Sequence, residues 1–344
     1  MLLRARGRFV VIKVEARLYD SGMAELLELQ SLTVELPTAA GWVKPVNDVS
    51  LRIAAGETLG LVGESGSGKT MLSLTLMGLL PPGARVSGEA RLASKNGSAK
   101  SLTALNEDGW RDVRGQEIAM IFQEPMTSLN PVMRIGAQID EAILAHEPNL
   151  ARDSLHRRLL TAMEHAAIPE PEIRAQQFPH QLSGGLRQRA MIAMALAPWP
   201  KLLIADEPTT ALDVTVQKQI LDLLDRLRRE LELALLFITH DLAVVANVAD
   251  RVAVMYAGRI VEQGPVRAVL TLPQHPYTQG LLAASPTLER RPLSPIPGTV
   301  PKLTELPPGC AFSSRCPFRS AKCEQAVPEF RRVDADHAAR CILL

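Results

Sequence analysis

The stretch Gly63-Glu64-Ser65-Gly66-Ser67-Gly68-Lys69-Thr70 decides the fold expected for this chain. Its glycines permit backbone conformations with positive φ and leave no Cβ in the way, so successive N–H groups can point at a bound triphosphate. In such a loop the lysine reaches the β and γ phosphate oxygens, and the hydroxyl after it binds Mg²⁺. The stretch therefore predicts a loop that binds a nucleoside triphosphate and Mg²⁺, with Lys69 and Thr70 in these two roles.

The residues on either side of the loop support this interpretation. The apolar run Thr58 to Val62 is typical of a buried strand, and Met71 to Leu80 have the pattern of a helix whose N-terminus would face the phosphates. A Gly/Ser-rich surface loop is the alternative, and the flanking strand and helix argue against it. We therefore expect an α/β fold built on a P-loop NTPase core.

Two alternating segments precede the loop. Residues 27–36 alternate between apolar and polar side chains as a strand does, with a change of phase at Gln30-Ser31 that a β-bulge would absorb. Val49 to Ile53 alternate in the same way. Two antiparallel strands ahead of the phosphate loop predict a mixed sheet.

Composition excludes several classes of protein. The 38 basic and 37 acidic residues of this 344-residue chain give a formal net charge of +1, so nothing indicates a nucleic-acid surface. No stretch approaches the ~18 uninterrupted apolar residues that cross a bilayer. Met1 to Val14 carry too many basic residues for a signal peptide. We expect a cytosolic chain whose membrane role, if any, runs through partners.

Further motifs follow the phosphate loop in a fixed order. They are Gln123 after Ile121-Phe122, the segment Leu182 to Gln188, the run Leu202 to Glu207, Ala211-Leu212-Asp213 and Thr239-His240. In this order they resemble the motifs of the ATP-binding cassette (ABC) ATPases of membrane transporters. The phosphate loop matches Walker A, and the later segments match, in turn, the Q-loop, the signature, the Walker B motif with its glutamate, the D-loop and the switch histidine. The resemblance covers roughly residues 25 to 265 and implies ATP binding and hydrolysis.

The resemblance assigns a chemical role to each matching polar residue. Asp206 would bind Mg²⁺ directly or through water together with Thr70 and Gln123, because hard cations prefer oxygen ligands. Glu207 would polarise or deprotonate the attacking water, and His240 would hold that water and the γ-phosphate. The alternatives are a solvated strand end for the acidic pair and a surface or N-cap histidine for His240.

The signature would serve a different ATP molecule. Ser183, Gly184 and Gly185 precede a helix pattern and would present its N-terminus to phosphate. In the family that phosphate belongs to the ATP on the Walker A loop of a second subunit, and Gln188 and Asp213 are the matching residues nearby. The alternative for Ser183 is a helix cap without a ligand.

The family also stacks an aromatic side chain on adenine from a loop ahead of Walker A. Trp42 is the nearest candidate, although a gapless alignment would place the position on Ala40. A partly exposed hairpin tryptophan is the alternative.

Three segments resemble the importer branch that handles oligopeptides, dipeptides and nickel. They are residues 123–131, Phe178 to Leu182 and His275 to Leu282. This branch implies a second, paralogous ATPase subunit, two membrane-spanning permease subunits and an extracytoplasmic solute-binding protein, with this chain at the cytoplasmic face of the membrane. Nickel or another small solute is the alternative cargo.

Two alternatives to a transporter ATPase fit the sequence less well. A soluble ABC ATPase without a transporter typically has two cassettes or a coiled-coil insertion, and this chain shows neither. A degenerate cassette that hydrolyses poorly is disfavoured because Glu207 and His240 are both retained.

The expected organisation has three parts. Residues 1–24 form an N-terminal extension that need not be ordered, and residues 25–265 form the ABC ATPase domain with an antiparallel β subdomain. Its helical subdomain spans about 126–185, with helices at Ile135 to Ala145 and Ala151 to Ala167 followed by a break at Pro169 and Pro171. Residues 266–344 form a small loop-rich extension.

The extension contains all four cysteines of the chain, Cys310, Cys316, Cys323 and Cys341. Four thiolates can hold a zinc ion or a [4Fe–4S] cluster, and the absence of a Cys-x-x-Cys pair disfavours a zinc ribbon. Arg315-Cys316 resembles the extension of peptide importers, some of which hold an iron–sulfur cluster. The sequence therefore favours a structural [4Fe–4S] cluster, with zinc or free thiols as alternatives.

Overall fold

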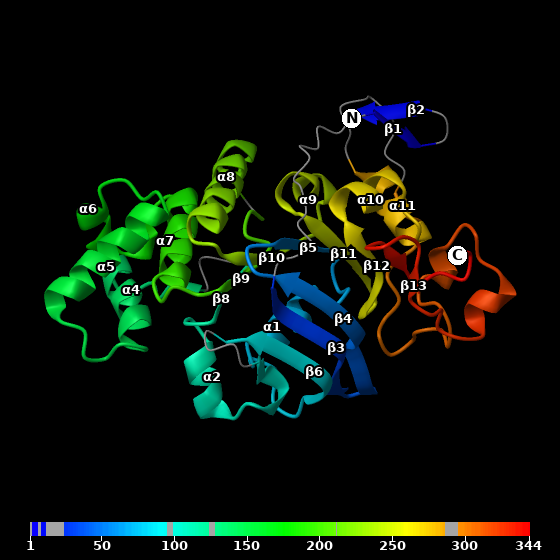
Figure 1. Ribbon diagram of the computed structural model, residues 1–344, viewed down its shortest axis with the longest axis horizontal. Helices are drawn as coiled ribbons and strands as arrows, with labels where there is room; N and C mark the ends of the chain where they lie inside the picture. Colours follow the sequence, from blue (N-terminus) through cyan, green and yellow to red (C-terminus); the bar gives the residue numbers. More distant parts are fainter. Residues whose placement is uncertain are drawn as a thin grey trace.

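An eight-stranded sheet runs through the centre of the molecule (Figure 1). The computed structural model describes residues 2–5, 8–11, 24–94, 99–123, 128–210, 212–285 and 295–344. Five neighbouring strands are parallel: β8 (Ile118–Ile121), β9 (Leu202–Asp206), β10 (Ala234–Thr239), β5 (Thr58–Val62) and β11 (Arg251–Tyr256). Four of them, β8, β9, β10 and β5, are buried over their whole length, as expected for apolar runs in a parallel sheet. The P-loop NTPase core is thereby confirmed.

The sheet continues past β11 with antiparallel strands. They are β12 (Arg259–Pro265), β14 (Ala338–Ala339) and β13 (Arg331–Arg332). The last two come from the C-terminal extension, which the sequence did not connect to the sheet. The extension therefore covers the backbone edge that β12 would otherwise expose.

The phosphate loop joins β5 to α1 (Lys69–Leu76). The sequence predicted a helix as far as Leu80, but α1 ends earlier. Gly78 has a φ of +63°, and a Cβ there would lie 2.3 Å from the Trp110 ring. The left-handed glycine ends the helix against that ring.

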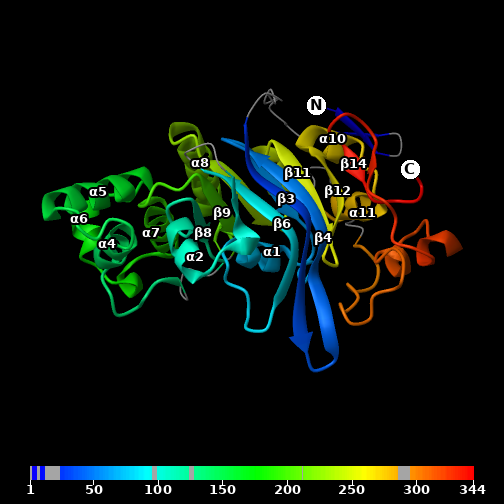
Figure 2. The ribbon, with the colours of Figure 1, turned by 60° about the horizontal axis from the view of Figure 1, so that its bottom comes forward.

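The strands ahead of the loop belong to a second sheet. Its order is β4 (Gly41–Ala54), β3 (Glu25–Thr38), β6 (Arg85–Ala93) and β7 (Ala99–Ser101), all antiparallel. This sheet agrees with the expected antiparallel β subdomain. The mixed sheet expected for these strands was wrong, because they do not join the central sheet, whose mixed character comes from β12, β14 and β13. The expected bulge is present, because the β3–β4 register shifts between Leu29 and Leu32, and Ser31 has a φ of +47°. Figure 2 shows the β3–β4 hairpin extending beyond the body of the molecule.

A helical lobe lies at the left of Figure 1. It contains α4 (Ile135–Leu144), α5 (Arg152–His165), α6 (Pro171–Ala175), η2 (Pro179–Gln181) and α7 (Gly184–Leu196). The two predicted helices are found within two residues of their expected ends. Pro171 was expected to break the helical pattern, but it also begins a new helix: it occupies the first turn of α6, where a proline is tolerated.

The remaining elements complete the core and the extension. They are η1 (Leu102–Ala104), α2 (Glu107–Val113), α8 (Val214–Glu230), α9 (Leu242–Val248), α10 (Val266–Thr271), α11 (Pro276–Ala284), η3 (Ser313–Arg315) and η4 (Ala321–Glu324). Buried side chains of the extension, including Tyr277 and Phe312, share one apolar cluster with β11 residues such as Tyr256. The extension at the right of Figure 1 is thus built onto the ATPase core.

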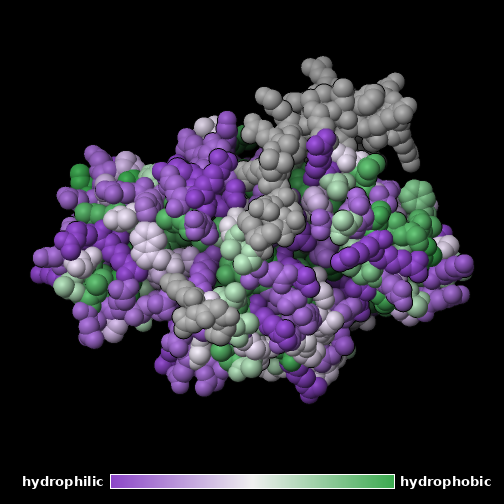
Figure 3. Space-filling model, in the orientation of Figure 1, coloured by the Kyte–Doolittle hydropathy of each residue, from purple (hydrophilic) through white to green (hydrophobic). Residues whose placement is uncertain are grey.

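Several expected segments fall outside the described residues. These are residues 1, 6–7 and 12–23 of the N-terminal extension, the start of the helical subdomain at 126–127, Ala211 of the D-loop and the proline-rich residues 286–294. Within the N-terminal extension, β1 (Leu2–Ala5) and β2 (Arg8–Val11) pair as an antiparallel hairpin. Within the described ranges, no helix has both the length and the apolar character to span a bilayer. The face in Figure 3 is mostly hydrophilic, and hydrophobic residues are scattered over it, with the largest group at the right, over the C-terminal extension.

Candidate functional site

The phosphate loop needs its glycines for two different reasons. Gly66 and Gly68 have φ angles of +79° and +107°, and a Cβ on Gly68 would lie 2.0 Å from the Pro45 carbonyl oxygen. Gly63 is not in the left-handed region, but a Cβ there would lie 2.2 Å from the Met255 carbonyl oxygen. The loop is therefore held between β4 on one side and β11 on the other.

The turn that follows β11 also holds the loop. The Gly258 N–H donates to the Ser67 carbonyl oxygen at 2.8 Å, and the Asn47 N–H donates to the Gly258 carbonyl oxygen at 2.8 Å. Ala257 and Gly258 both have positive φ, as a tight hairpin turn requires. Sequence reasoning missed this contribution, although the Ala257-Gly258 turn was a readable signal.

Lys69 lies inside the loop that precedes it. Its Nζ donates to the carbonyl oxygens of Gly63 at 2.8 Å and Glu64 at 3.0 Å. Burial lowers the pKa of the ammonium, and the carboxylates of Glu207 and Asp206 counteract this effect. The lysine charge is thus kept at the loop by acidic residues from the end of β9.

Asp206 has the properties of a hard-cation ligand. It is 2% exposed at the end of β9, burial raises the pKa of its carboxyl, and a hydrogen bond from the Thr70 hydroxyl opposes that rise. Among the described residues nothing hydrogen-bonds its Oδ1. A buried carboxylate oxygen without a partner beside a hydroxyl fits the oxygen donor set that Mg²⁺ requires.

Glu207 is the centre of a polar network. Gln123 Nε2 donates to its Oε2 at 3.1 Å, and His240 Nδ1 lies 3.4 Å from its Oε1. The Thr210 hydroxyl also donates to Oε2, at 2.9 Å. Glu207 itself has a φ of +48°, a strained conformation for a non-glycine residue that costs about 1–3 kcal/mol and is typical of functional sites.

These residues meet because of the sheet topology. Gln123 follows β8, Glu207 follows β9, and His240 follows β10, so all three lie at the carboxyl edge of neighbouring parallel strands. Gly63 follows β5 at the same edge. Ligands of open α/β sheets bind at this edge. Thr210 is the network residue that the sequence analysis did not name.

The signature segment begins α7. Ser183 is the N-cap, and its Oγ accepts a hydrogen bond from the Leu186 N–H at 3.3 Å. Ser183 and Gly184 are exposed, whereas a Cβ on Gly185 would lie 2.9 Å from the Val216 side chain. The start of α7 therefore packs against α8 and leaves its first residues open to a ligand.

Asp213 and Gln188, the other two residues expected near the signature, lie in different surroundings. Asp213 caps α8, accepting from the Val216 N–H at 2.9 Å, and is exposed next to Val214, which is 83% exposed. Gln188 is 2% exposed on α7, and its Nε2 has no hydrogen-bond acceptor in the described part of the chain. The assignment of both residues to a nucleotide remains a prediction.

Trp42 lies near the tip of the β3–β4 hairpin. It is 46% exposed, and the Arg85 guanidinium lies 4.0 Å from its ring centroid. Pro45, three residues further along β4, contacts the phosphate loop at Gly68. Adenine stacking by Trp42 also remains a prediction. The Arg85 guanidinium already lies over the ring, where an adenine would otherwise stack.

The four cysteines lie within electrostatic reach of one another. Burial, with a smaller contribution from the other three thiols, raises the pKa of Cys310 to about 11. All four are free, and the Cys310 N–H donates to the Cys323 carbonyl oxygen at 2.7 Å. In the described part of the chain, however, no three His, Cys, Asp or Glu side chains are arranged to hold a metal ion. The iron–sulfur cluster therefore stays a prediction.

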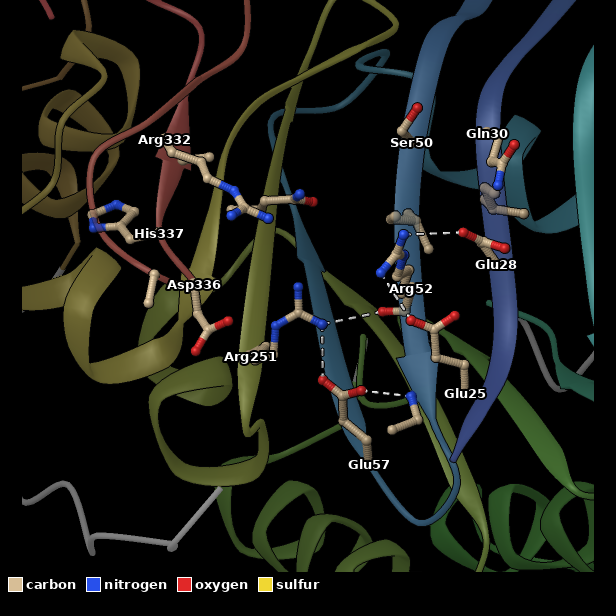
Figure 4. Close-up of a pocket in the computed structure, with 16 residues that line it drawn as sticks. Glu25, Glu28, Gln30, Ser50, Arg52, Glu57, Arg251, Arg332, Asp336 and His337 are labelled. Atoms are coloured by element: carbon tan, nitrogen blue, oxygen red, sulfur yellow. Dashed lines mark hydrogen bonds and ion pairs between the residues drawn. The ribbon is translucent and has the colours of Figure 1, made fainter. Parts of the chain in front are cut away.

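A cavity of about 470 Å³ lies elsewhere, between the second sheet and the β11–β14 edge (Figure 4). Arg251 pairs with Glu57 at 3.2 Å, and Arg52 pairs with Glu28 at 3.2 Å. None of the predicted site residues lines it. The charges that face this cavity largely neutralise one another, which distinguishes it from the phosphate site.

Comparisons with known proteins agree with this geometry. Residues 46–210 match the family described as "ABC transporter", and residues 261–323 match "Oligopeptide/dipeptide transporter, C-terminal region". A putative peptide import ATP-binding protein of Brucella ovis is 49% identical over 327 residues, covering 92% of this chain and 96% of the relative. The oligopeptide transport ATP-binding protein OppD of Bacillus subtilis is 48% identical over 327 residues, covering 93% and 90%.

A solved structure shows the same fold. It is a dimeric, post-hydrolysis ATP-binding cassette, MJ0796, bound to ADP and Pi. Its TM-score is 0.61 at 27% identity, and the match covers 70% of this chain and 99% of that one. The sequence relatives, the two family matches and this structural neighbour lead to one assignment: the chain belongs to the ATP-hydrolysing subunits of ABC transporters, in the group that carries the oligopeptide/dipeptide transporter C-terminal region.

Proposed function

We propose that this chain powers the uptake of peptides through an ABC transporter. The observation that carries the proposal is the convergence of Gln123, His240 and Thr210 on the Glu207 carboxylate, beside the phosphate loop. This network is suited to position a water molecule for attack on a phosphate. The peptide cargo is supported by the C-terminal region and by the names of the relatives.

The residues divide the work of hydrolysis. Backbone N–H groups of residues 63–70 and the Lys69 ammonium bind the phosphates, and Thr70, Asp206 and Gln123 would hold Mg²⁺. The metal, when bound, would neutralise negative charge on the phosphates. Glu207 then accepts a proton from the attacking water or polarises it, and His240 orients it. Because phosphoryl transfer needs mainly positioning and charge stabilisation, these residues would supply this chain's share of the catalysis.

The signature completes a site on another subunit. Ser183, Gly184 and Gly185 would bind the γ-phosphate of the ATP held by the partner, and Gln188 and Asp213 would line the same interface. The exposed Ser183 and Gly184 at the start of α7 support this assignment. The partner is expected to be a paralogous ATPase subunit, so that a heterodimer holds two ATP molecules, each adenine stacked on an aromatic such as Trp42.

The transporter would contain further subunits. Two membrane-spanning permeases would contact the helical lobe, and an extracytoplasmic solute-binding protein would deliver the peptide. The chain would then lie at the cytoplasmic face of the cytoplasmic membrane. A reconstituted complex should hydrolyse ATP faster when its binding protein carries peptide, and stimulation by nickel alone would contradict the peptide assignment.

A [4Fe–4S] cluster held by Cys310, Cys316, Cys323 and Cys341 belongs to the same proposal. Support comes from the clustering of four thiols in one small extension and from their mutual effect on pKa. Anaerobic purification followed by iron and sulfide analysis tests it, and a protein with neither element or with stoichiometric zinc would refute it.

Glu207→Gln is the main test of the catalytic assignment. The variant should bind ATP, form a stable ATP-bound dimer with its partner subunit, and hydrolyse ATP about 100-fold or more slowly, as expected when a general base is lost. Glu164→Gln, at an exposed position on α5, is the matched control and should leave the rate unchanged. Undiminished hydrolysis by Glu207→Gln would exclude the assigned role.

A further inference from the structure

The second residue of the phosphate loop is bound by the C-terminal extension. Arg315 Nη1 donates to Glu64 Oε2 at 2.6 Å, and Arg315 Nη2 donates to Glu64 Oε1 at 3.0 Å. The two residues are 251 positions apart in the chain. Two parallel N–H···O bonds between a guanidinium and a carboxylate form the strongest and most directional type of ion pair.

Arg315 is fixed before it reaches the loop. Its side chain is 4% exposed, and its Nε donates to the Pro297 carbonyl oxygen at 2.9 Å. The guanidinium carbon also lies 5.9 Å from each of the Tyr256 and Phe312 ring centroids. The extension thus presents a preorganised cation to Glu64, and little side-chain entropy is lost when the pair forms.

The backbone of Glu64 is held as well. Its N–H donates to the Tyr277 hydroxyl oxygen at 2.8 Å, and Tyr277 is fully buried on α11. Burial raises the pKa of this phenol, so the hydroxyl remains protonated at neutral pH. Both the side chain and the main chain of Glu64 are therefore fixed by residues that follow the ATPase core in sequence.

Charge gives this arrangement a consequence for ligand binding. Glu64 lies close enough to Lys69 to affect the pKa of its ammonium. An unpaired carboxylate at this position would repel a triphosphate and would compete for the lysine charge that the phosphates need. Paired with Arg315, the same carboxylate contributes little net field.

We propose that Arg315 is a positioning residue for ATP binding, acting from the C-terminal extension. It neutralises Glu64 and, together with Tyr277, holds the first part of the phosphate loop in the conformation that receives the triphosphate. A disturbance of the extension around the four cysteines would then change ATP affinity through Arg315, which directly precedes Cys316. The inference rests on the proposal that residues 63–70 bind ATP.

The test measures binding of the fluorescent analogue TNP-ATP to the purified full-length chain. Arg315→Met should weaken binding about tenfold or more, since it leaves a carboxylate unpaired beside the phosphates. The double variant Glu64→Gln/Arg315→Met should return to within about threefold of the wild type, because the repelling charge is gone. The deficit of Arg315→Met should also shrink in 0.5 M NaCl, which screens charge repulsion but not a loss of shape.

Other variants keep the proposal falsifiable. Tyr277→Phe keeps the buried ring and removes one hydrogen-bond acceptor, so it should weaken binding about threefold. Unchanged affinity in Arg315→Met, or a double variant as weak as Arg315→Met, would overturn the proposal. If Arg315→Met fails to fold, unchanged affinity in Tyr277→Phe overturns it instead. Failure of ATP binding itself is recognised separately, because then the wild type would bind no better than Lys69→Ala.

Discussion

Replacing Glu262 by glutamine should destabilise the junction between the ATPase core and the C-terminal extension. Glu262 is on β12 and is fully buried. Its Oε1 accepts from the Gln274 N–H at 2.8 Å and lies 2.7 Å from His337 Nε2. Its Oε2 accepts from the His275 N–H at 2.9 Å. One carboxylate therefore binds β12 to the start of α11 and to the segment just before β14.

The magnitude follows from the hydrogen-bond inventory. Glutamine keeps one oxygen, which can still accept hydrogen bonds from the Gln274 N–H and from His337. Its NH₂ group then faces the His275 N–H, and because both groups are donors they cannot form a hydrogen bond. The variant loses one hydrogen bond to a charged group, about 1.5–3 kcal/mol, and leaves buried donors unsatisfied at about 1–3 kcal/mol. We expect a loss of about 3–5 kcal/mol, which corresponds to roughly 4–7 °C in melting temperature for a chain of this size.

Thermal unfolding followed by circular dichroism measures this effect. Hydrogen exchange should also show faster exchange in β14 and α11 than in β9 or β10, because the junction would open locally. Glu164→Gln makes the same chemical change at an exposed site and should shift the melting temperature by less than about 1 °C. A Glu262→Gln melting temperature within about 1 °C of the wild type would refute the reasoning.

Three further predictions concern other parts of the molecule. Burial lowers the pKa of His275 to about 4, against about 6.5 when unfolded, so only the unfolded chain is protonated between these values. Urea titrations should therefore show up to about 3 kcal/mol of stability lost as pH falls from 6.5 to 4, and a loss of the same size in His275→Asn would contradict this. Gly68→Ala should weaken ATP binding far more than Gly66→Ala. Both positions have positive φ, +107° and +79°, but the new Cβ would lie 2.0 Å from a backbone oxygen at residue 68 and would have no atom within 4 Å at residue 66. Equal TNP-ATP affinities would argue against the close-approach explanation. Thr210→Ala should lower kcat about 3–10-fold with the KM for ATP unchanged, since the hydroxyl only orients Glu207. Thr210→Ser, which keeps a hydroxyl, should restore kcat, and a change confined to KM would count against this role.

Local sequence patterns were sufficient to predict the core of the fold. The strand, loop and helix around Gly63 to Thr70 are contiguous in the chain, so their apolar runs and glycines were enough to predict all three. Asp206 and His240 were predicted from their resemblance to motifs of ABC ATPases, and the structure explains why they meet: Asp206 ends β9, His240 follows β10, and parallel strands bring their carboxyl ends to one edge. The bulge at Ser31 was predictable for a similar reason, since a change of phase in an alternating pattern has few structural solutions.

Contacts between distant segments could not be predicted in this way. β14 has only two residues, which is too short for any periodic pattern, and its partner is on β12. Arg315 was noted beside a cysteine, but nothing in the sequence indicated that its guanidinium reaches Glu64. Such contacts depend on how the extension folds back, which is set by tertiary packing around Tyr277 and not by local propensity.

The edge of the central sheet also has a consequence for biosynthesis. Glu262 on β12 pairs with Ala339 on β14, so 76 residues separate the two partners. During translation at about 5–20 residues per second, β12 would emerge several seconds before the strand that covers it. For that interval its N–H and C=O groups are an open template for a neighbouring nascent chain. Ribosomes that stall within the extension should therefore release aggregation-prone products, even though the nucleotide motifs have already been synthesised.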